Sequence, residues 1–439
     1  MGSRGIGVVI WLVSLSAGSL AAPWVPLDDV RARLAWDALP GETRLHSVWP
    51  LSWGRVEDAL AQAPTAARGL EQAYLGYELD RVRRQPATSE SGFRLANGRA
   101  PLSDAAWQEQ PENSAVARAD ALSGNWSLTL SLSHERASLL DDTRWSVRDT
   151  QLSWLDGNWM VGAGWVPRHW GASWTTPLGL SENGSDFPAA WVERYRSIPS
   201  AGIWRFLGPW HVILFVGQLE DGRAVSHTKV LGARFTFKPL PWFEAGLYRI
   251  AQWGGEGRPQ TMSSLVDLAL GRDNVGSDGI DRNNEPGNQV GGLDLTLSGP
   301  GQTRLTLQVQ GEDEANGLPS HVVRLAELSK GLDTELGLLQ AVLSWADTRT
   351  QGGPSGILYN ITYNHSIYTS GLRYRARALG SVLDNDARSV ALRLYLWQQD
   401  STLWGVRLQR YRLNEDGTLR ASAPGGIYRQ SWLAGRPVL

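Results

Sequence analysis

The chain has 439 residues, no cysteine and a formal net charge of −2. A charge this small gives no support for nucleic acid as a partner, and a chain without cysteine carries neither a disulfide nor a lipoprotein anchor. Tryptophan is the commonest aromatic residue, with 22 Trp against 11 Tyr and 7 Phe. Because indole rings favour membrane interfaces and also stack on sugars, this surplus indicates aromatic girdles, a sugar-stacking surface, or both.

The first residues read as a secretory signal peptide. Arg4 precedes an apolar run that ends at Leu20, and small residues lead up to Pro23. The run is too short to cross a bilayer as a helix, and no later stretch comes near the roughly 18 apolar residues that a helical span needs. We therefore expect residues 1–21 to be removed after Ala21 on export.

Residues 22–88 are predicted to form a small helical bundle. Leu27, Val30 and Leu34 recur at helical spacing, and Ser52 is a suitable N-cap for a second helix. A third helix, between the prolines at 64 and 86, is expected to place Leu70, Ala73, Tyr74 and Tyr77 on one face.

In the remainder, 89–439, the hydrophobic period changes to two. Leu128 and Leu130 alternate with Ser127 and Thr129, and segments of this kind are about ten residues long, as a tilted membrane strand requires. Similar segments are predicted at 231–238, 293–297, 305–309, 357–363 and 390–396, with weaker ones near Phe93 and Tyr428. The sequence thus predicts an all-β transmembrane barrel of about 18 antiparallel strands in the outer membrane, with a small N-terminal α-helical bundle. The non-aromatic C-terminus leaves the placement of the last strand open.

Three arginines at alternate positions, Arg373, Arg375 and Arg377, are predicted to share one face of a strand. Facing lipid would cost about 2–4 kcal/mol for each near the midplane, so we expect them in the lumen. They would form either a structural lattice of ion pairs or a site for sugar acids or phosphate. The carboxylates expected to join this network are Glu220, Glu244, Glu256, Glu312 and Asp313.

Two aromatic segments are candidates for polysaccharide binding. Trp170 and Trp174 lie in a long polar connection, where they form either a stacking surface for sugars or one side of the interfacial belt. Trp253, Glu256 and Arg258 lie in a Gly-rich turn that suits a lectin site and an inward-folded plug equally well.

No catalytic, cofactor or metal site is predicted. The acidic run that starts at Glu312 lacks a demonstrable glycosidase geometry, and the run that starts at Asp384 lacks the later ligands of a calcium loop. The chain has no Gly-x-Ser-x-Gly elbow, which argues against a membrane hydrolase.

Several longer motifs resemble the capsule assembly Wzi family, in the order in which that family carries them. They are WPLSWGRVEDAL from Trp49, LGLSENGSDFP from Leu178, QWGGEGRP from Gln252, EPGNQ from Glu285, GEDEANGLP from Gly311 and YRARALGSVLDNDAR from Tyr374. The resemblance spans nearly the whole mature chain. It implies an eighteen-stranded barrel, a helical bundle on the periplasmic side, an occluded lumen and extracellular loops that meet polysaccharide.

On this basis we expect a non-enzymatic, lectin-like protein that anchors or organises capsular polysaccharide or exopolysaccharide at the cell surface. Its further partners would be outer-membrane lipid, lipopolysaccharide and, during biogenesis, the barrel assembly machinery. The alternative function is an outer-membrane channel for anionic solutes or oligosaccharides, since a lumen lined with charged groups selects solutes by charge.

Overall fold

A computed structural model describes most of the chain. The described residues are 23–39, 44–63, 69–95, 113–137, 142–271, 280–281, 284–315, 318–352, 356–417 and 428–438. The predicted signal peptide, 1–21, lies outside them. None of the described helices is long and apolar enough to cross a membrane.

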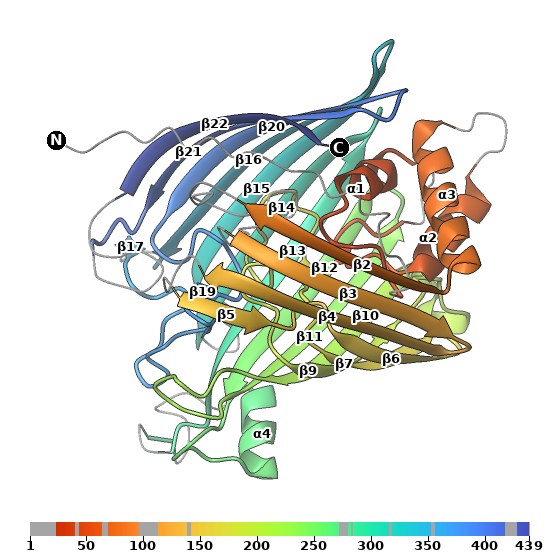
Figure 1. The fold of residues 1–439 in the computed structure, drawn as a ribbon. Coiled ribbons are helices and arrows are strands. Elements are labelled where there is room, and N and C mark those ends of the chain that lie inside the picture. Colours follow the sequence, from red (N-terminus) through yellow and green to blue (C-terminus); the bar gives the residue numbers. More distant parts are fainter. Residues whose placement is uncertain are drawn as a thin grey trace.

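Within the described residues, eighteen strands form one closed barrel (Figure 1). Every pairing is antiparallel and runs between strands close in the chain, from β2 to β22. The strands are β2 (Ala87–Leu95), β3 (Asn113–Ser123), β4 (Trp126–Ala137), β5 (Asp142–Ser146), β6 (Gln151–Asp156), β7 (Trp159–Gly164), β9 (Ala189–Arg194), β10 (Trp210–Gln218), β11 (Lys229–Leu240), β12 (Phe243–Trp253), β13 (Gly287–Gly299), β14 (Thr303–Ala315), β15 (Leu318–Thr334), β16 (Gly337–Gln351), β17 (Ile357–Leu358), β20 (Arg388–Gln398), β21 (Leu403–Leu413) and β22 (Tyr428–Val438).

The period-two pattern decides which side chains face outward. On β4, Leu128 and Leu130 are exposed, whereas Ser127 and Thr129 between them are buried inside the barrel. A barrel that is apolar outside and polar inside matches lipid on one face and a hydrated or protein-filled lumen on the other. The predicted transmembrane barrel is confirmed.

Exposed tryptophans gather where the short turns join the strands. Trp126 and Trp154 pair across β4 and β6 with ring centroids 6.4 Å apart, and Trp242 lies in the turn between β11 and β12. Trp159 and Trp404 are also exposed, at the ends of β7 and β21 that adjoin short turns. These rings form an aromatic girdle of the kind that marks a membrane interface.

Three helices sit at the short-turn end of the barrel (Figure 1): α1 (Val30–Ala38), α2 (Trp53–Gln62) and α3 (Leu70–Arg84). The predicted N-cap is confirmed, because the Ser52 side chain accepts a hydrogen bond from the backbone N–H of Arg55. The third predicted helix is confirmed as α3, and Leu70 and Tyr74 of its predicted face pack against the core. Tyr77 of the same face is 64% exposed, and the fully buried apolar residues of α3 are Leu75, Leu79 and Val82.

The helices close this end of the barrel by packing against its inner wall. Nearly all of α1 is buried, and its residues share one hydrophobic cluster with Val342 of β16 and Trp397 of β20. Tyr74 of α3 contacts the same Trp397 edge-on at 5.2 Å. The bundle is therefore docked on the barrel and is not an independent domain.

One predicted strand is wrong. The alternation at 357–363 forms only the two-residue β17, and the chain then turns inward with left-handed backbone at Asn360 (φ 60°) and Tyr363 (φ 60°). Tyr363 is buried instead of facing outward. Four more short strands lie away from the barrel wall: β1 (Val48–Trp49) pairs with β8 (His169–Trp170), and β18 (Arg373–Tyr374) pairs with β19 (Arg377–Ala378).

Candidate functional site

An irregular segment, 166–188, fills much of the barrel lumen, and we call it the lumen segment. It joins β7 to β9, and almost all of its side chains are buried. Inward-facing polar side chains of the wall satisfy its backbone: Glu327 accepts the N–H of Trp174 at 2.7 Å, and Gln308 accepts that of Leu178 at 2.6 Å. Non-helical backbone at membrane depth is stable only where protein or water supplies such partners.

The expected exposure of Trp170 and Trp174 is wrong. Trp170 is 2% exposed and packs between Phe215 and Tyr248, with ring centroids 5.7 and 6.0 Å away. Trp174 is fully buried, with the Arg33 guanidinium 4.6 Å above its ring. The connection that carries both rings folds into the lumen, so neither offers a face to a polymer.

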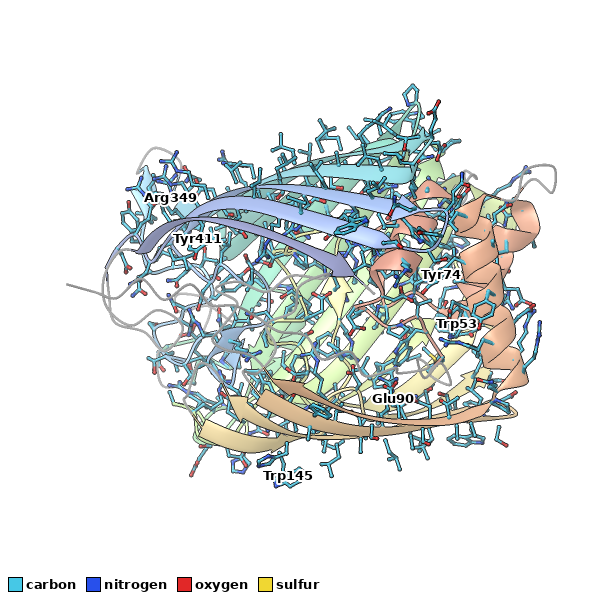
Figure 2. The ribbon with its side chains drawn as sticks, turned by 45° about the horizontal axis from the view of Figure 1, so that its top comes forward. Trp53, Tyr74, Glu90, Trp145, Arg349 and Tyr411 are labelled. Atoms are coloured by element: carbon cyan, nitrogen blue, oxygen red, sulfur yellow. The ribbon has the colours of Figure 1, made fainter. Side chains whose placement is uncertain are left out.

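Replacing Trp174 by Phe should destabilise the folded barrel by about 1–3 kcal/mol, because the Asp37 carboxylate loses the indole N–H that it accepts at 2.8 Å. The same change at Trp145, which points away from the barrel (Figure 2) and is 64% exposed, is the control and should have almost no effect. The measurement is the temperature at which heat-modifiable gel mobility is lost. Equal shifts for both variants would contradict a buried role for Trp174.

The three predicted lumen arginines do not share a strand face. Arg375 (φ 49°) and Ala376 (φ 65°) form the turn of the small β18–β19 hairpin. The three arginines therefore lie on the two sides and the tip of a hairpin, and not along one strand. Arg373 is buried and donates to both carboxylate oxygens of Asp384, at 2.6 and 3.0 Å. Arg375 is half-buried over the ring of Tyr374, and Arg377 is half-buried.

The predicted carboxylates divide between two places. Glu220 lies beside Arg223, at 3.6 Å, and beside Arg375, and Glu312 accepts the backbone N–H of Tyr363. Glu244 lies at the opposite, helical end of the barrel. Glu256 is exposed in the turn after β12. The side chain of Asp313 lies outside the part of the structure described.

Glu244 anchors the N-terminal segment to the barrel wall. Its carboxylate accepts the backbone N–H groups of His46 and Ser47, at 2.8 and 2.9 Å, and the Ser47 hydroxyl at 2.5 Å. The same hydroxyl accepts a hydrogen bond from Arg234, whose guanidinium pairs with Asp294 at 2.7 Å. The wall therefore binds the N-terminal segment through charged groups that the sequence places at inward-facing strand positions.

Asp37 links three parts of the chain at the helical end. Its carboxylate pairs with Arg304 of β14 at 2.8 Å, contacts the His46 ring at 3.3 Å and accepts the Trp174 indole N–H. Burial alone would raise the pKa of Asp37, but Arg304 and His46 hold it below its usual value. The sequence pattern contained no sign of this cluster beyond the inward position of Arg304.

His46 makes the docking of the N-terminal segment sensitive to pH. Burial, with the Arg304 charge nearby, lowers the pKa of His46 well below its usual value, so the folded protein holds the ring neutral. The unfolded chain takes up a proton as the pH falls through about 6.5, so stability is full above that pH and declines below it.

We expect the wild type to lose about 1.4 kcal/mol per pH unit more than a His46→Asn variant between pH 6 and pH 5, because one proton fewer is bound by the folded state. The measurement compares the two unfolding temperatures at pH 7.5 and 5.0. Parallel profiles for the two proteins would show that His46 does not carry the effect.

At the loop end, the predicted turn forms the base of an external helix, α4 (Met262–Ala269). Trp253 is half-buried and donates its indole N–H to Ser264 at 3.1 Å, while Arg258 is half-buried nearby. Arg249, which points outward from β12, donates to the Ala269 carbonyl at 2.9 Å. The helix therefore lies outside the barrel wall, and Trp253, Glu256 and Arg258 stay together on one accessible turn.

A second cluster at the loop end was missed by the sequence reasoning. Arg349, Arg388 and Arg412 surround the Glu415 carboxylate, at 3.6, 2.9 and 3.4 Å. Asp347 also pairs with Arg349, at 2.6 Å, so three cations face two anions, and Tyr359 beside them is 43% exposed. Figure 2 places Arg349 at the end of the barrel away from the helices. The charged residues of the cluster come from β16, β20, β21 and the turn after β21, between residues 347 and 415, and no contiguous motif reveals it.

The geometry defines a class: a transmembrane β-barrel of the outer membrane, closed by helices at one end and occupied by its own chain within. The model of the family "Capsule assembly protein Wzi" matches residues 103–435, and the chain belongs to this family.

Two relatives match this chain over most of their length, one in sequence and one in structure. An uncharacterised 55.8 kDa protein of the cps region of Klebsiella pneumoniae is 30% identical over 433 residues, which cover 94% of this chain and 82% of that protein. The solved structure of Wzi, described as an outer membrane protein involved in group 1 capsule assembly in Escherichia coli and a carbohydrate-binding β-barrel, matches with a TM-score of 0.80 and 24% identity. That match covers 94% of this chain and 91% of the solved one, and it supports the barrel fold described above.

Proposed function

We propose that this protein is a non-enzymatic, lectin-like protein of the outer membrane that anchors or organises capsular polysaccharide or exopolysaccharide at the cell surface. Membership of the Wzi capsule assembly family supports this role. The solved relative at 24% identity is described as carbohydrate-binding, which supports polysaccharide as the partner here.

We further propose an orientation with the helical bundle, 22–88, in the periplasm and the long connections of the barrel, 89–439, outside the cell. Bacterial outer-membrane barrels have short periplasmic turns and longer extracellular loops. The short turns here lie at the helical end, as at Glu335-Leu336 between β15 and β16, and α4 lies at the other. A barrel in this orientation would have as further partners outer-membrane lipid, lipopolysaccharide and, during biogenesis, the barrel assembly machinery.

The filled lumen is the observation that favours a tether over a channel. The lumen segment and the β18–β19 hairpin occupy the space that a solute would need. Tyr363 links them, because it donates its hydroxyl to the Leu178 carbonyl at 2.6 Å and accepts a hydrogen bond from Arg373 at its own carbonyl, at 3.1 Å. A channel for anionic solutes would require these hydrogen bonds to break and the two segments to leave the lumen.

Polymer would then meet the loop end through two surfaces, the turn with Trp253, Glu256 and Arg258, and the arginine cluster around Glu415 with Tyr359. Aromatic faces and guanidinium forks suit sugar rings and their acidic substituents. Each contact is weak, but repeated engagement along a polymer gives strong retention.

Replacing both Arg388 and Arg412 by Gln should release polymer from cells. If each guanidinium contributes about 1.5 kcal/mol to one polymer contact, its loss lowers the affinity of that contact roughly tenfold. The measurement is the ratio of cell-bound to released polysaccharide, with total synthesis expected to stay constant.

Arg83→Gln, an exposed change on α3 at the opposite end, is the matched control and should leave this ratio unchanged. Normal retention in a correctly folded double variant would exclude the arginine cluster as the polymer contact. Normal retention in a strain that lacks the whole protein would contradict the proposed function itself.

A further inference from the structure

A groove of about 580 Å³ lies on the outer, lipid-facing wall of the barrel, across strands β4, β6, β7, β9, β10 and β11. We call it the wall groove. The surface that its lining exposes is almost wholly apolar, and the lining residues include Leu128, Leu152, Ala163, Ala190, Val216 and Lys229.

The wall groove follows from small residues in the middle of one cross-strand row. Leu152 pairs with Ala163, Ala163 with Ala190, and Ala190 with Val216. All four side chains point outward, and Leu152 and Val216 are 48% and 47% exposed. Because two methyl groups stand between two larger side chains, the wall is concave along this row.

The lining of the groove extends toward the loop end of the barrel, where it includes Gln218 and Lys229, and does not include Val161 on the girdle side. The next outward position on β7 toward the short turns is Val161, which is 47% exposed. Toward the loop end, β7 and β9 stop at Gly164 and Ala189, where the chain turns into the lumen. Trp165 and Pro188, just beyond these two strand ends, also line the groove, so the groove continues past the edge of the sheet.

A single cation marks the open end among the residues lining the groove. Lys229 is the first residue of β11, points outward with Leu231 and Ala233, and donates from Nζ to the Gln218 side chain across the rim. A lysine at the edge of a lipid-facing surface extends its ammonium group to the headgroup layer. The groove thus has an apolar body and a positive end, the complement of an acyl chain with an anionic head.

We propose that the wall groove binds one acyl chain of a phosphorylated glycolipid of the lipopolysaccharide type, with a phosphate of its head beside Lys229. The assignment rests on the proposed orientation, which places the loop end, and with it the open end of the groove, in the outer leaflet. It does not depend on which residues contact the polysaccharide.

The experiment is native mass spectrometry of the full mature protein in detergent, with bisphosphorylated lipid A as the probe and its dephosphorylated form and phosphatidylglycerol as comparisons. We expect preferential retention of bisphosphorylated lipid A by the wild type. Filling the groove with Ala163→Leu and Ala190→Leu should lower retention about tenfold, the equivalent of two acyl methylene groups no longer buried. Lys229→Gln should lower it about fivefold, and only for the phosphorylated lipid.

The matched control is Ala233→Leu, an exposed outward alanine on β11 outside the groove, which should bind like the wild type. Heat-modifiable mobility confirms that each variant is folded. Equal retention of phosphatidylglycerol and lipid A, or wild-type retention by the filled groove, would overturn the proposal. A dimer that disappears when the groove is filled would also overturn it, because the occupant would then be a second copy of the chain. Normal polymer retention by cells carrying the filled groove would leave the proposed function intact, so the two can fail separately.

Discussion

Replacing Asp37 by Ala is expected to detach the N-terminal segment from the barrel and to destabilise the protein by about 3–5 kcal/mol, the usual cost of leaving one partner of a buried ion pair uncompensated. Arg304, 6% exposed, would lose the carboxylate 2.8 Å away. Trp174 would lose the acceptor of its indole N–H, also at 2.8 Å. One change therefore weakens contacts among helix α1, strand β14 and the lumen segment.

Two measurements check this expectation: the unfolding temperature from gel mobility, and protease cleavage within residues 44–52. Asp80→Ala is the control, because Asp80 forms an exposed pair with Arg84 one turn away on α3, and such pairs contribute about 0.3–0.5 kcal/mol. An Asp80 variant as unstable as the Asp37 variant would show that the buried cluster has no special role.

A paired replacement separates charge from packing at the same place. Exchanging Asp37 and Arg304 together for Leu and Met removes both buried charges, and such exchanges are often neutral or stabilising. We expect the pair to recover much of the stability that Asp37→Ala loses, though not the hydrogen bond of Trp174. A pair as unstable as the single variant would argue that the contacts to His46 and Trp174 dominate.

Removing the lumen segment is expected to turn an occluded barrel into a conducting one. Gly164 and Ala189 are direct partners in the β7–β9 ladder. A two-residue Asn-Gly turn can therefore replace residues 165–188, since turns of this type close adjacent antiparallel strands. Planar-bilayer recordings should show steady currents that the wild type lacks.

The matched control removes helix α4, which lies outside the lumen. Replacing residues 257–283 with a flexible linker deletes α4, which is held against the outer wall by Arg249, and should leave the conductance unchanged. The sequence alone had suggested that this connection could be the plug, and the position of α4 is against that interpretation. Large currents from the wild type, or from the α4 deletion alone, would favour the channel function.

The sequence by itself determined the features that depend on local chemistry. Strand positions and the side that each residue faces follow from alternation, as with Leu128 and Thr129, because lipid and lumen select opposite polarity at adjacent positions. The start of α2 at Ser52 follows from a side-chain cap within three residues. The family motifs indicated the class of protein because each of them is a contiguous stretch of sequence.

Tertiary structure alone decided where the irregular segments lie. Trp174 and Trp145 have similar polar neighbours in the sequence, yet one is fully buried and the other is 64% exposed. The difference arises because the barrel creates an interior whose Glu327 and Gln308 side chains satisfy the lumen segment across more than a hundred residues of chain. Arg373 likewise leaves the predicted strand because Asp384 offers it a buried partner within a turn. Local patterns contain neither the cavity nor the distant hydrogen-bonding partners, and these two factors determine what fills the lumen and what remains at the surface.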